Sequence, residues 1–439
     1  MPQPFALTGA TVVTGDTQGT LLPGRTVVVG PDGRIEAVGA AADTHVPPGY
    51  RQLDVTGHYV TPGLINAHAH LFADGLPLPA LLVNERTSNL VAAAGRSALG
   101  QLVFRKRAKD NALTQLHSGV TTLRSVGDVA YEVVRVAGEI DRGKYHGPRI
   151  LASGPLLAVT GGHGAPQVAL VSDSPWDARR STRINLRRGV KAIKIAATAG
   201  VTDARAIGYA GRPEMTEEEM TAICEEAHTA GIRVAAHAQS TAGILASLRA
   251  GVDTIEHGAR LTPEVVELFR HNPRSLTGSS ALIPTIQACL PLARLPQSAT
   301  KADDIVRANA ELVLEGMLQG IRDAREGGVT LGMGTDSAVT YATHYNVWRE
   351  LDMLVRYGGL TPAEALAAAT GTNAAILGLD AETGSVEVGR SADLVVLAGN
   401  PLDGFRAFVD PVMVIARGTV IDHPTVERHP DLDAQLDSL

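Results

Sequence analysis

Two histidines separated by a single residue, His68 and His70, end an apolar stretch in the first quarter of the chain. Side chains alternate across a strand, so a strand that ends His-Ala-His places both imidazoles on one face and Ala69 on the other. Imidazole is a common metal ligand, and two imidazoles at the end of a buried strand are costly unless they bind something. The pair indicates a metal site, but it could also be two ordinary polar residues, and only distant partners can decide.

Further candidate ligands stand in or at the ends of other apolar stretches. His237 and His257 each end a predicted strand, and Asp336 ends the last one. Lys194 lies within an apolar stretch, where desolvation lowers the pKa of a lysine and makes its amine nucleophilic. Taken singly, His257 could be a core histidine, Asp336 a helix N-cap and Lys194 a surface lysine. Taken together, four histidines, an aspartate and a lysine predict a dinuclear metal centre.

The stretches that carry these residues alternate with helix-like segments. Strands are predicted at 60–67, 120–126, 149–153, 190–196, 232–238, 252–256, 282–286 and 329–334. Helices are predicted at roughly 84–116, 129–143, 176–188, 217–230, 240–250, 263–270, 302–327 and 346–357. Eight β/α units favour a (β/α)8 TIM barrel, whose active site lies at the carboxyl ends of its strands. A doubly wound sheet is the alternative, but no glycine-rich phosphate turn follows an early strand.

Both ends of the chain have a sequence pattern that is typical of short β-strands separated by turns containing Gly, Pro and Asp. The strand-like stretches are 11–14, 25–29 and 34–38 at one end, and 384–389, 392–397 and 412–420 at the other. Neither set is large enough to be stable alone. We therefore expect residues 1–59 and 380–439 to form one small β-sandwich domain, with the α/β TIM barrel of residues 60–379 inserted into it.

The composition of the chain indicates which kinds of molecule it binds. The chain has 439 residues, a formal charge of −7 and no basic block, which argues against binding to nucleic acid. Its two cysteines, Cys224 and Cys289, form neither a CxxC pair nor a disulfide framework. The sequence shows no signal peptide and no run of 18 apolar residues. We expect a cytoplasmic protein that acts on a small-molecule substrate without a membrane, and a homo-oligomer is left open.

The order of the candidate ligands along the chain resembles that of the amidohydrolase superfamily. The matching residues are His68, His70, Lys194, His237, His257 and Asp336. The motif Thr160-Gly161-Gly162-His163-Gly164, together with Pro284-Thr285, is similar to the imidazolonepropionase-like branch. That branch includes Xaa-Pro, Xaa-Arg and Xaa-Lys dipeptidases and ochratoxin-hydrolysing amidohydrolases. The likeness runs over nearly the whole chain.

The resemblance implies a particular metal chemistry. CO2 would carbamylate Lys194 and so turn a cation into a bridging oxygen ligand. Mononuclear members lack this lysine, so its presence favours two divalent metal ions, and the donor types suit zinc. One ion would be held by His68, His70 and Asp336 and the other by His237 and His257, with the carbamate and a hydroxide between them.

These ligands predict a hydrolase that cleaves a carbon–nitrogen amide bond. Asp336 would act as general base and then as general acid. His163, in a glycine-flanked loop, would stabilise the oxyanion or hold a substrate carboxylate, although it could also be a loop histidine with structural hydrogen bonds. Further candidates for substrate contacts are His344, Tyr345, Arg205 and Arg212.

The expected substrate is an N-acyl amino acid or a dipeptide that is cleaved at its C-terminal residue, as by a carboxypeptidase or dipeptidase, and ochratoxin-type amides are included. A glycine-rich loop exposes backbone N–H groups that could bind the substrate carboxylate. The alternatives are a hydrolase of cyclic amides, as in imidazolonepropionase, and a phosphotriesterase or lactonase. A non-catalytic scaffold would be expected to have lost ligands, and here all six positions are filled.

Overall fold

Parallel strands and helices make up the middle of the chain in the computed structural model, which describes residues 2–77 and 93–439. A three-stranded parallel sheet consists of β6 (Leu64–Ala69), β7 (Val120–Ser125) and β8 (Arg149–Ala152). A seven-stranded parallel sheet has the order β10-β9-β11-β12-β13-β14-β15. Its strands are β9 (Leu156–Ala158), β10 (Ala169–Val171), β11 (Ile193–Ala196), β12 (Val234–Ala238), β13 (Thr254–His257), β14 (Ala281–Ile283) and β15 (Thr330–Leu331).

Backbone hydrogen bonds link these two sheets at two places. The Ala67 amide donates to the Met333 carbonyl (3.1 Å), which ties β6 to the segment after β15. On the other side, the Lys191 amide donates to the Ala152 carbonyl (2.8 Å), which ties β8 to the segment before β11. The parallel pairing and the alternation of strands with helices fit a TIM-barrel fold.

The predicted helices form with small shifts at their ends, except the first, predicted at 84–116, which is interrupted at Ser97 because this side chain caps the start of α2. Their bounds are α2 (Ala98–His117), α3 (Glu132–Asp141), α4 (Pro175–Arg187), α5 (Glu217–Thr229), α6 (Thr241–Ala250), α7 (Pro263–Arg270), α10 (Asp304–Glu326) and α11 (Val347–Arg356). Residues 84–92 of the first predicted helix lie outside the described residues. Helix α5 begins with a capping box, in which Thr216 and Glu219 satisfy each other's backbone amides.

The first predicted strand, 60–67, is in fact two strands that belong to different sheets. Chain direction changes at Gly63, where a Cβ atom would lie 2.1 Å from Thr121 Oγ1, so only glycine fits. Before it, β5 (Tyr59–Pro62) pairs with β16 (Leu394–Leu397) in the sheet of the chain ends. After it, β6 carries His68 towards the site.

Several short elements were not predicted, among them two strands and two helices of the middle segment. Strands β9 and β10 have three residues each, too few for an alternating pattern to be recognised. Helices α8 (Ile286–Arg294) and α9 (Gln297–Thr300) fill the connection between β14 and α10, and α8 contains Pro291, which argues against a helix on sequence grounds. After α11 the chain continues through α12 (Pro362–Ala367), a π-helical turn η2 (Ala368–Thr372) and α13 (Asn373–Leu377).

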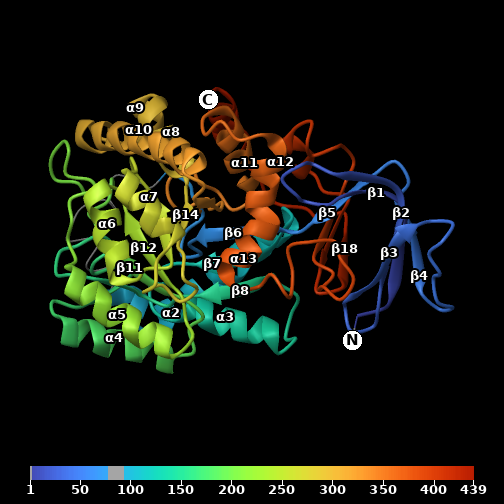
Figure 1. The fold of residues 1–439 in the computed structure, drawn as a ribbon, viewed down its shortest axis with the longest axis horizontal. Coiled ribbons are helices and arrows are strands. Elements are labelled where there is room, and N and C mark those ends of the chain that lie inside the picture. The colour runs from blue at the N-terminus through green and yellow to red at the C-terminus, as the bar shows by residue number, and fades with distance from the viewer. Residues whose placement is uncertain (1, 78–92) are drawn as a thin grey trace.

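Strands from both ends of the chain share one eight-stranded sheet, beside the helices and strands of the middle segment (Figure 1). The order is β18-β17-β16-β5-β1-β2-β3, and β4 pairs with β1. Bounds not yet given are β1 (Phe5–Val13), β2 (Leu21–Val29), β3 (Ile35–Ala40), β4 (Arg51–Asp54), β17 (Met413–Ala416) and β18 (Thr419–Asp422). The expected strand at 384–389 is wrong: this segment is turns, and Gly384 and Gly389 both have positive φ angles. The sandwich arrangement and the domain bounds stay predictions.

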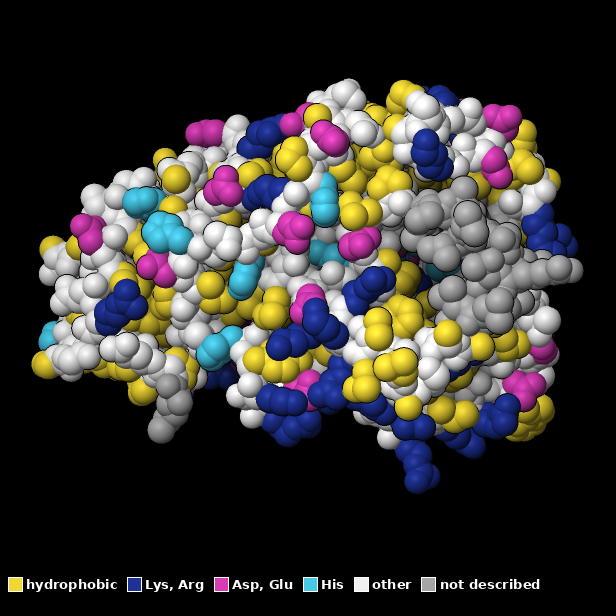
Figure 2. Space-filling view, turned by 180° about the vertical axis from the view of Figure 1, so that it is seen from behind, with side chains coloured by type: hydrophobic (Ala, Val, Ile, Leu, Met, Phe, Trp, Pro, Cys, Tyr) yellow, Lys and Arg dark blue, Asp and Glu magenta, His cyan; other side chains and the backbone are white. Residues whose placement is uncertain are grey.

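The last residues return to the middle segment. Helix α14 (Pro430–Asp437) packs Leu432 and Leu436 against Leu295 and Tyr341. On the face shown in Figure 2, charged side chains of both signs are interspersed with hydrophobic ones. Within the described part of the chain, no helix is both long and apolar enough to cross a membrane.

Candidate active site

The predicted metal ligands meet at the carboxyl ends of the parallel strands. His68 is the next-to-last residue of β6, Lys194 lies in β11, and His237 lies in β12. His257 is the last residue of β13, and Asp336 follows β15. Parallel pairing keeps these ends level, because Ala196 pairs with His237 and Ala238 pairs with His257.

Distances confirm that these side chains form one cluster. The Nε2 atoms of His68 and His70 lie 3.3 and 3.1 Å from Asp336 Oδ1. The ring centroid of His257 lies 4.9 Å from that of His68 and 4.6 Å from that of His237. One ligand atom each of His68, His257 and Asp336 lie within 4.8 Å of one another, and all three residues are buried. This triad could hold a metal ion.

The backbone is unusual at two of these residues. His257 has a φ of 69° and Asp336 a φ of 55°, in the left-handed region that residues other than glycine rarely adopt. Such a conformation costs about 1–3 kcal/mol per residue and is concentrated at functional sites. The fold therefore holds both side chains in place against a local preference.

Each of the four histidines has one ring nitrogen against an oxygen of the protein. The pairs are His68 Nδ1 with Glu256 Oε2 (2.6 Å), His70 Nδ1 with the Gly127 carbonyl (3.3 Å), His257 Nδ1 with Thr285 Oγ1 (2.7 Å) and His237 Nε2 with the Ala199 carbonyl (3.4 Å). Contacts of this kind orient a metal-binding imidazole and select its tautomer. For His68 and His70 the opposite ring nitrogen, Nε2, faces Asp336 Oδ1, which fits metal ligation.

The amine of Lys194 is buried and has no hydrogen-bond partner among the described residues. Burial lowers its pKa to about 8, although the negative charges of Glu256 and Asp336 act in the opposite direction. Its own charge contributes to lowering the pKa values of His237 and His257, after burial and neighbouring histidines. An unpartnered buried amine beside the imidazoles suits a group that becomes a metal ligand, and the donor types of the cluster fit a divalent metal ion.

A buried ion pair behind the cluster was not predicted. Arg124 Nη2 donates to Glu256 Oε1 (2.7 Å), and Arg124 Nε donates to the Ala67 carbonyl (2.7 Å). Burial alone would raise the pKa of Glu256, but Arg124 and His68 outweigh it and hold this pKa well below its usual range. Glu256 is thus an anion that fixes His68. A charged residue inside an apolar strand, such as Arg124 in β7, was the available sequence signal.

His163 lies in the loop between β9 and β10, against the metal cluster. Its ring stacks on His237 with centroids 4.1 Å apart, and its Nδ1 lies 2.8 Å from Asp203 Oδ1. Burial opposes the charged form, but Asp203 outweighs it and raises the pKa of His163. Gly200 permits this approach, because a Cβ there would lie 2.3 Å from His163 Nδ1. Asp203 was not recognised, because its partner lies 40 residues away.

Two predicted substrate contacts, Arg205 and Arg212, are exposed side chains on the loop after β11. A Cβ on Gly161 would lie 3.9 Å from Arg205 Nη2, so this guanidinium borders the loop of His163. Arg212 lies over the ring of Tyr209, 5.7 Å from its centroid. Arg205 is therefore better placed than Arg212 to reach a group held by His163.

The other two predicted contacts, His344 and Tyr345, are buried and bonded within the protein. The ring nitrogens of His344 face Gln115 Nε2 (3.1 Å) and the Ala73 carbonyl (2.7 Å). Burial lowers the pKa of His344 to about 4. The hydroxyl of Tyr345 accepts a hydrogen bond from the His429 amide (3.0 Å). A substrate role for this pair stays a prediction.

Comparison with known proteins agrees with this geometry. The model of the amidohydrolase family matches residues 59–426. A solved structure from Bifidobacterium longum, provisionally named a prolidase, is 51% identical, covers 100% of this chain and 99% of its own, and has a TM-score of 0.88. A prolidase complexed with N-methylphosphonate-L-proline is 26% identical, with 96% and 100% covered and a TM-score of 0.80. Ochratoxinase of Aspergillus niger is 28% identical over 94% of this chain and 87% of its own length. The chain belongs to the amidohydrolase family and is an enzyme that hydrolyses amide bonds.

Proposed function

We propose that this enzyme uses two divalent metal ions to hydrolyse N-acyl amino acids or dipeptides at the amide bond next to a free C-terminal carboxylate. The observation that carries the proposal is the buried, unpartnered amine of Lys194 among the imidazoles and Asp336. A lysine that stayed charged there would gain no ion pair among the described residues to offset its desolvation. Reaction of its neutral amine with CO2 forms an N–C bond, releases a proton and gives an anionic ligand.

Two metal ions divide these ligands between them. His68, His70 and Asp336 would hold one ion, and His237 and His257 the other, with the Lys194 carbamate common to both. Zinc suits imidazole, carboxylate and carbamate oxygen alike. When bound, such a pair lowers the pKa of water and polarises a carbonyl group.

Asp336 would be the residue that moves the proton. Its Oδ1 lies at the centre of the cluster, 3.1 Å from His70 Nε2, and its pKa is held well below its usual range, because His68 and His70 outweigh burial. The carboxylate is therefore ionised and able to accept the proton of the attacking water. Transfer of that proton to the departing amine completes the cleavage.

His163 and Arg205 would hold the substrate carboxylate. Asp203 orients the His163 ring and favours its charged form, and the stacking on His237 fixes the distance between this anchor and the cluster. An anchor at a fixed distance selects which amide bond meets the attacking water. The prolidase complex with N-methylphosphonate-L-proline supports an amino acid on the leaving side.

A matched pair of substrates tests the proposal: one dipeptide with a free C-terminus and the same dipeptide amidated there. Loss of the charge-assisted contact should lower kcat/KM for the amidated form by on the order of 10²-fold. Lactams and phosphotriesters complete the panel. Equal cleavage of both dipeptides, or activity towards lactams or triesters alone, would contradict the substrate class while leaving the metal site standing.

A further inference from the structure

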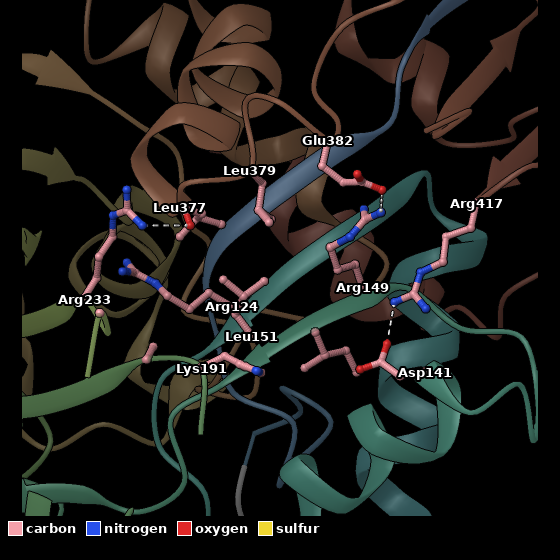
Figure 3. A pocket seen from close by; sticks show the side chains of 13 residues that line it. Arg124, Asp141, Arg149, Leu151, Lys191, Arg233, Leu377, Leu379, Glu382 and Arg417 are labelled. Carbon is pink, nitrogen blue, oxygen red and sulfur yellow. Dashed lines mark hydrogen bonds and ion pairs between the residues drawn. The ribbon is translucent and has the colours of Figure 1, made fainter. Parts of the chain in front are cut away.

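A cavity of about 480 Å³ lies near the amino ends of the parallel strands, whereas the candidate active site lies at their carboxyl ends. Figure 3 shows the side chains that line this cavity. Arg149 begins β8 at its wall, Lys191 lies two residues before β11, and Arg233 directly precedes β12. The wall also includes Leu377 at the end of α13, Leu379 just after it, and Arg417 in the turn between β17 and β18. The cavity thus lies where the sheet of the chain ends meets the amino ends of the strands.

Most of the cationic side chains in the wall already have acidic partners. Arg149 contacts Asp393 Oδ2 (2.9 Å) and Glu382 Oε1 (3.3 Å), Arg417 contacts Asp141 Oδ1 (3.0 Å), and Arg124 contacts Glu256 Oε1 (2.7 Å). Figure 3 shows the pairs of Arg149 and Arg417 on one side of the cavity. These ion pairs account for the charge of the three arginines without a ligand.

Lys191 and Arg233 differ from those three arginines in their ion pairing. Across residues 2–77 and 93–439, neither has a carboxylate oxygen within 4.0 Å. Arg233 Nη1 donates a long hydrogen bond of 3.4 Å to the Leu377 carbonyl, and its guanidinium lies against Gly378, where a Cβ would be 2.2 Å from Nη1. The backbone thus positions the Arg233 guanidinium at the cavity wall while leaving its charge without a counterion.

We propose that this cavity binds a small organic dianion, such as a phosphate monoester or a dicarboxylate. Its volume is within the range of small-molecule sites. Lys191 and Arg233 would each supply charge-assisted hydrogen bonds to the anionic group or groups, and the side chains of Leu151, Leu377 and Leu379 would pack against the carbon skeleton. The site is separate from the metal cluster, so the proposal does not depend on which amide the enzyme cleaves.

The test is calorimetric titration of the purified enzyme with two dianions, phenyl phosphate and phthalate, which distinguish the two ligand sources. Benzoate and benzyl alcohol serve as probes of lower charge. We expect at least one dianion to bind with a stoichiometry of one per chain, and Lys191→Gln or Arg233→Gln to weaken it about tenfold or more. Lys106→Gln, on an exposed face of α2, is the matched control and should bind normally.

Anions can also bind metal centres, so Lys194→Ala, which should lower the metal content, serves as a second control. Binding that survives in Lys194→Ala and is weakened in the Lys191 and Arg233 variants supports the proposal. The proposal is overturned if neither dianion binds, if binding is lost in Lys194→Ala, or if it is unchanged in the two cavity variants. Because Arg233 also contacts helix α13, Lys191→Gln, at an exposed position, reports on charge without that structural role.

Discussion

The metal cluster and the His163 loop lie against each other but are built differently. Cluster residues stand on parallel strands, and the side chain of His68 is 1% exposed. His163 stands in a loop between two three-residue strands, and its side chain is 24% exposed. Backbone pairing and buried contacts fix the first group, whereas the second depends on Asp203 and Glu214 from another loop.

In the proposed function, the metal cluster carries out the cleavage and the His163 loop selects the substrate. Strand ends give a rigid arrangement of ligands that many substrates can share, while loops can change without disturbing it. If this division holds, changes in the cluster should reduce turnover of every substrate and alter metal content. Changes in the loop should affect only substrates with a free carboxylate.

The largest effect is expected for Lys194→Ala. Removal of the proposed bridging ligand should lower metal content and reduce turnover by on the order of 10³-fold or more, for all substrates alike. Metal analysis measures the metal content, and steady-state kinetics measure the turnover. Added propionate should partly restore both quantities. Lys191→Ala, three residues earlier and outside the cluster, is the control. A Lys194→Ala enzyme with normal metal content would show that this amine is no ligand.

Asp336→Asn should keep the fold and lower kcat by roughly 10²–10⁴-fold, because an amide can fill the position but cannot accept a proton. Circular dichroism and metal analysis should show that structure and metal binding persist. Near-normal turnover in this variant would remove Asp336 from the proton-transfer role.

His163→Gln tests the role proposed for the loop, which is to bind the substrate carboxylate. It should reduce kcat/KM by about 10²-fold for a free-acid dipeptide and have little effect on the amidated one, since the amide lacks the charge that His163 binds. Metal content should match that of the unaltered enzyme. An equal loss for both substrates would instead place His163 at the reacting carbonyl.

Glu256→Gln should weaken metal binding by about 10–100-fold, because His68 loses the anion that orients its ring. Breaking a buried ion pair also costs about 3–5 kcal/mol of stability, so thermal unfolding is measured in parallel. Glu267→Gln, at an exposed position of α7, is the control. Unchanged metal affinity in a folded Glu256→Gln enzyme would refute the orienting role.

The sequence predicted which side chains lie together in the cluster, because the ends of strands have a recognisable pattern. His68 and His70 share a face through the alternation of a strand, and His237, His257 and Asp336 each close an apolar stretch. The pairing of both chain ends in one sheet followed from the scarcity of strands at each end.

Other parts of the site depend on contacts between distant residues. Arg124 and Glu256 are 132 residues apart, and no local sequence pattern predicts that they form an ion pair. Strands β9 and β10 are too short for periodicity, although they frame His163. The π-helical turn and the split of the first strand at Gly63 are likewise set by tertiary packing.

Metal content of the reconstituted enzyme tests the central claim most directly. Purified protein is loaded with zinc in the presence of bicarbonate and freed of excess metal. Elemental mass spectrometry then gives the number of metal ions bound per chain. The account predicts two metal ions per chain, falling to one or fewer in Lys194→Ala. A single ion per chain after full reconstitution, with full activity, would contradict a centre in which Lys194 joins two metals.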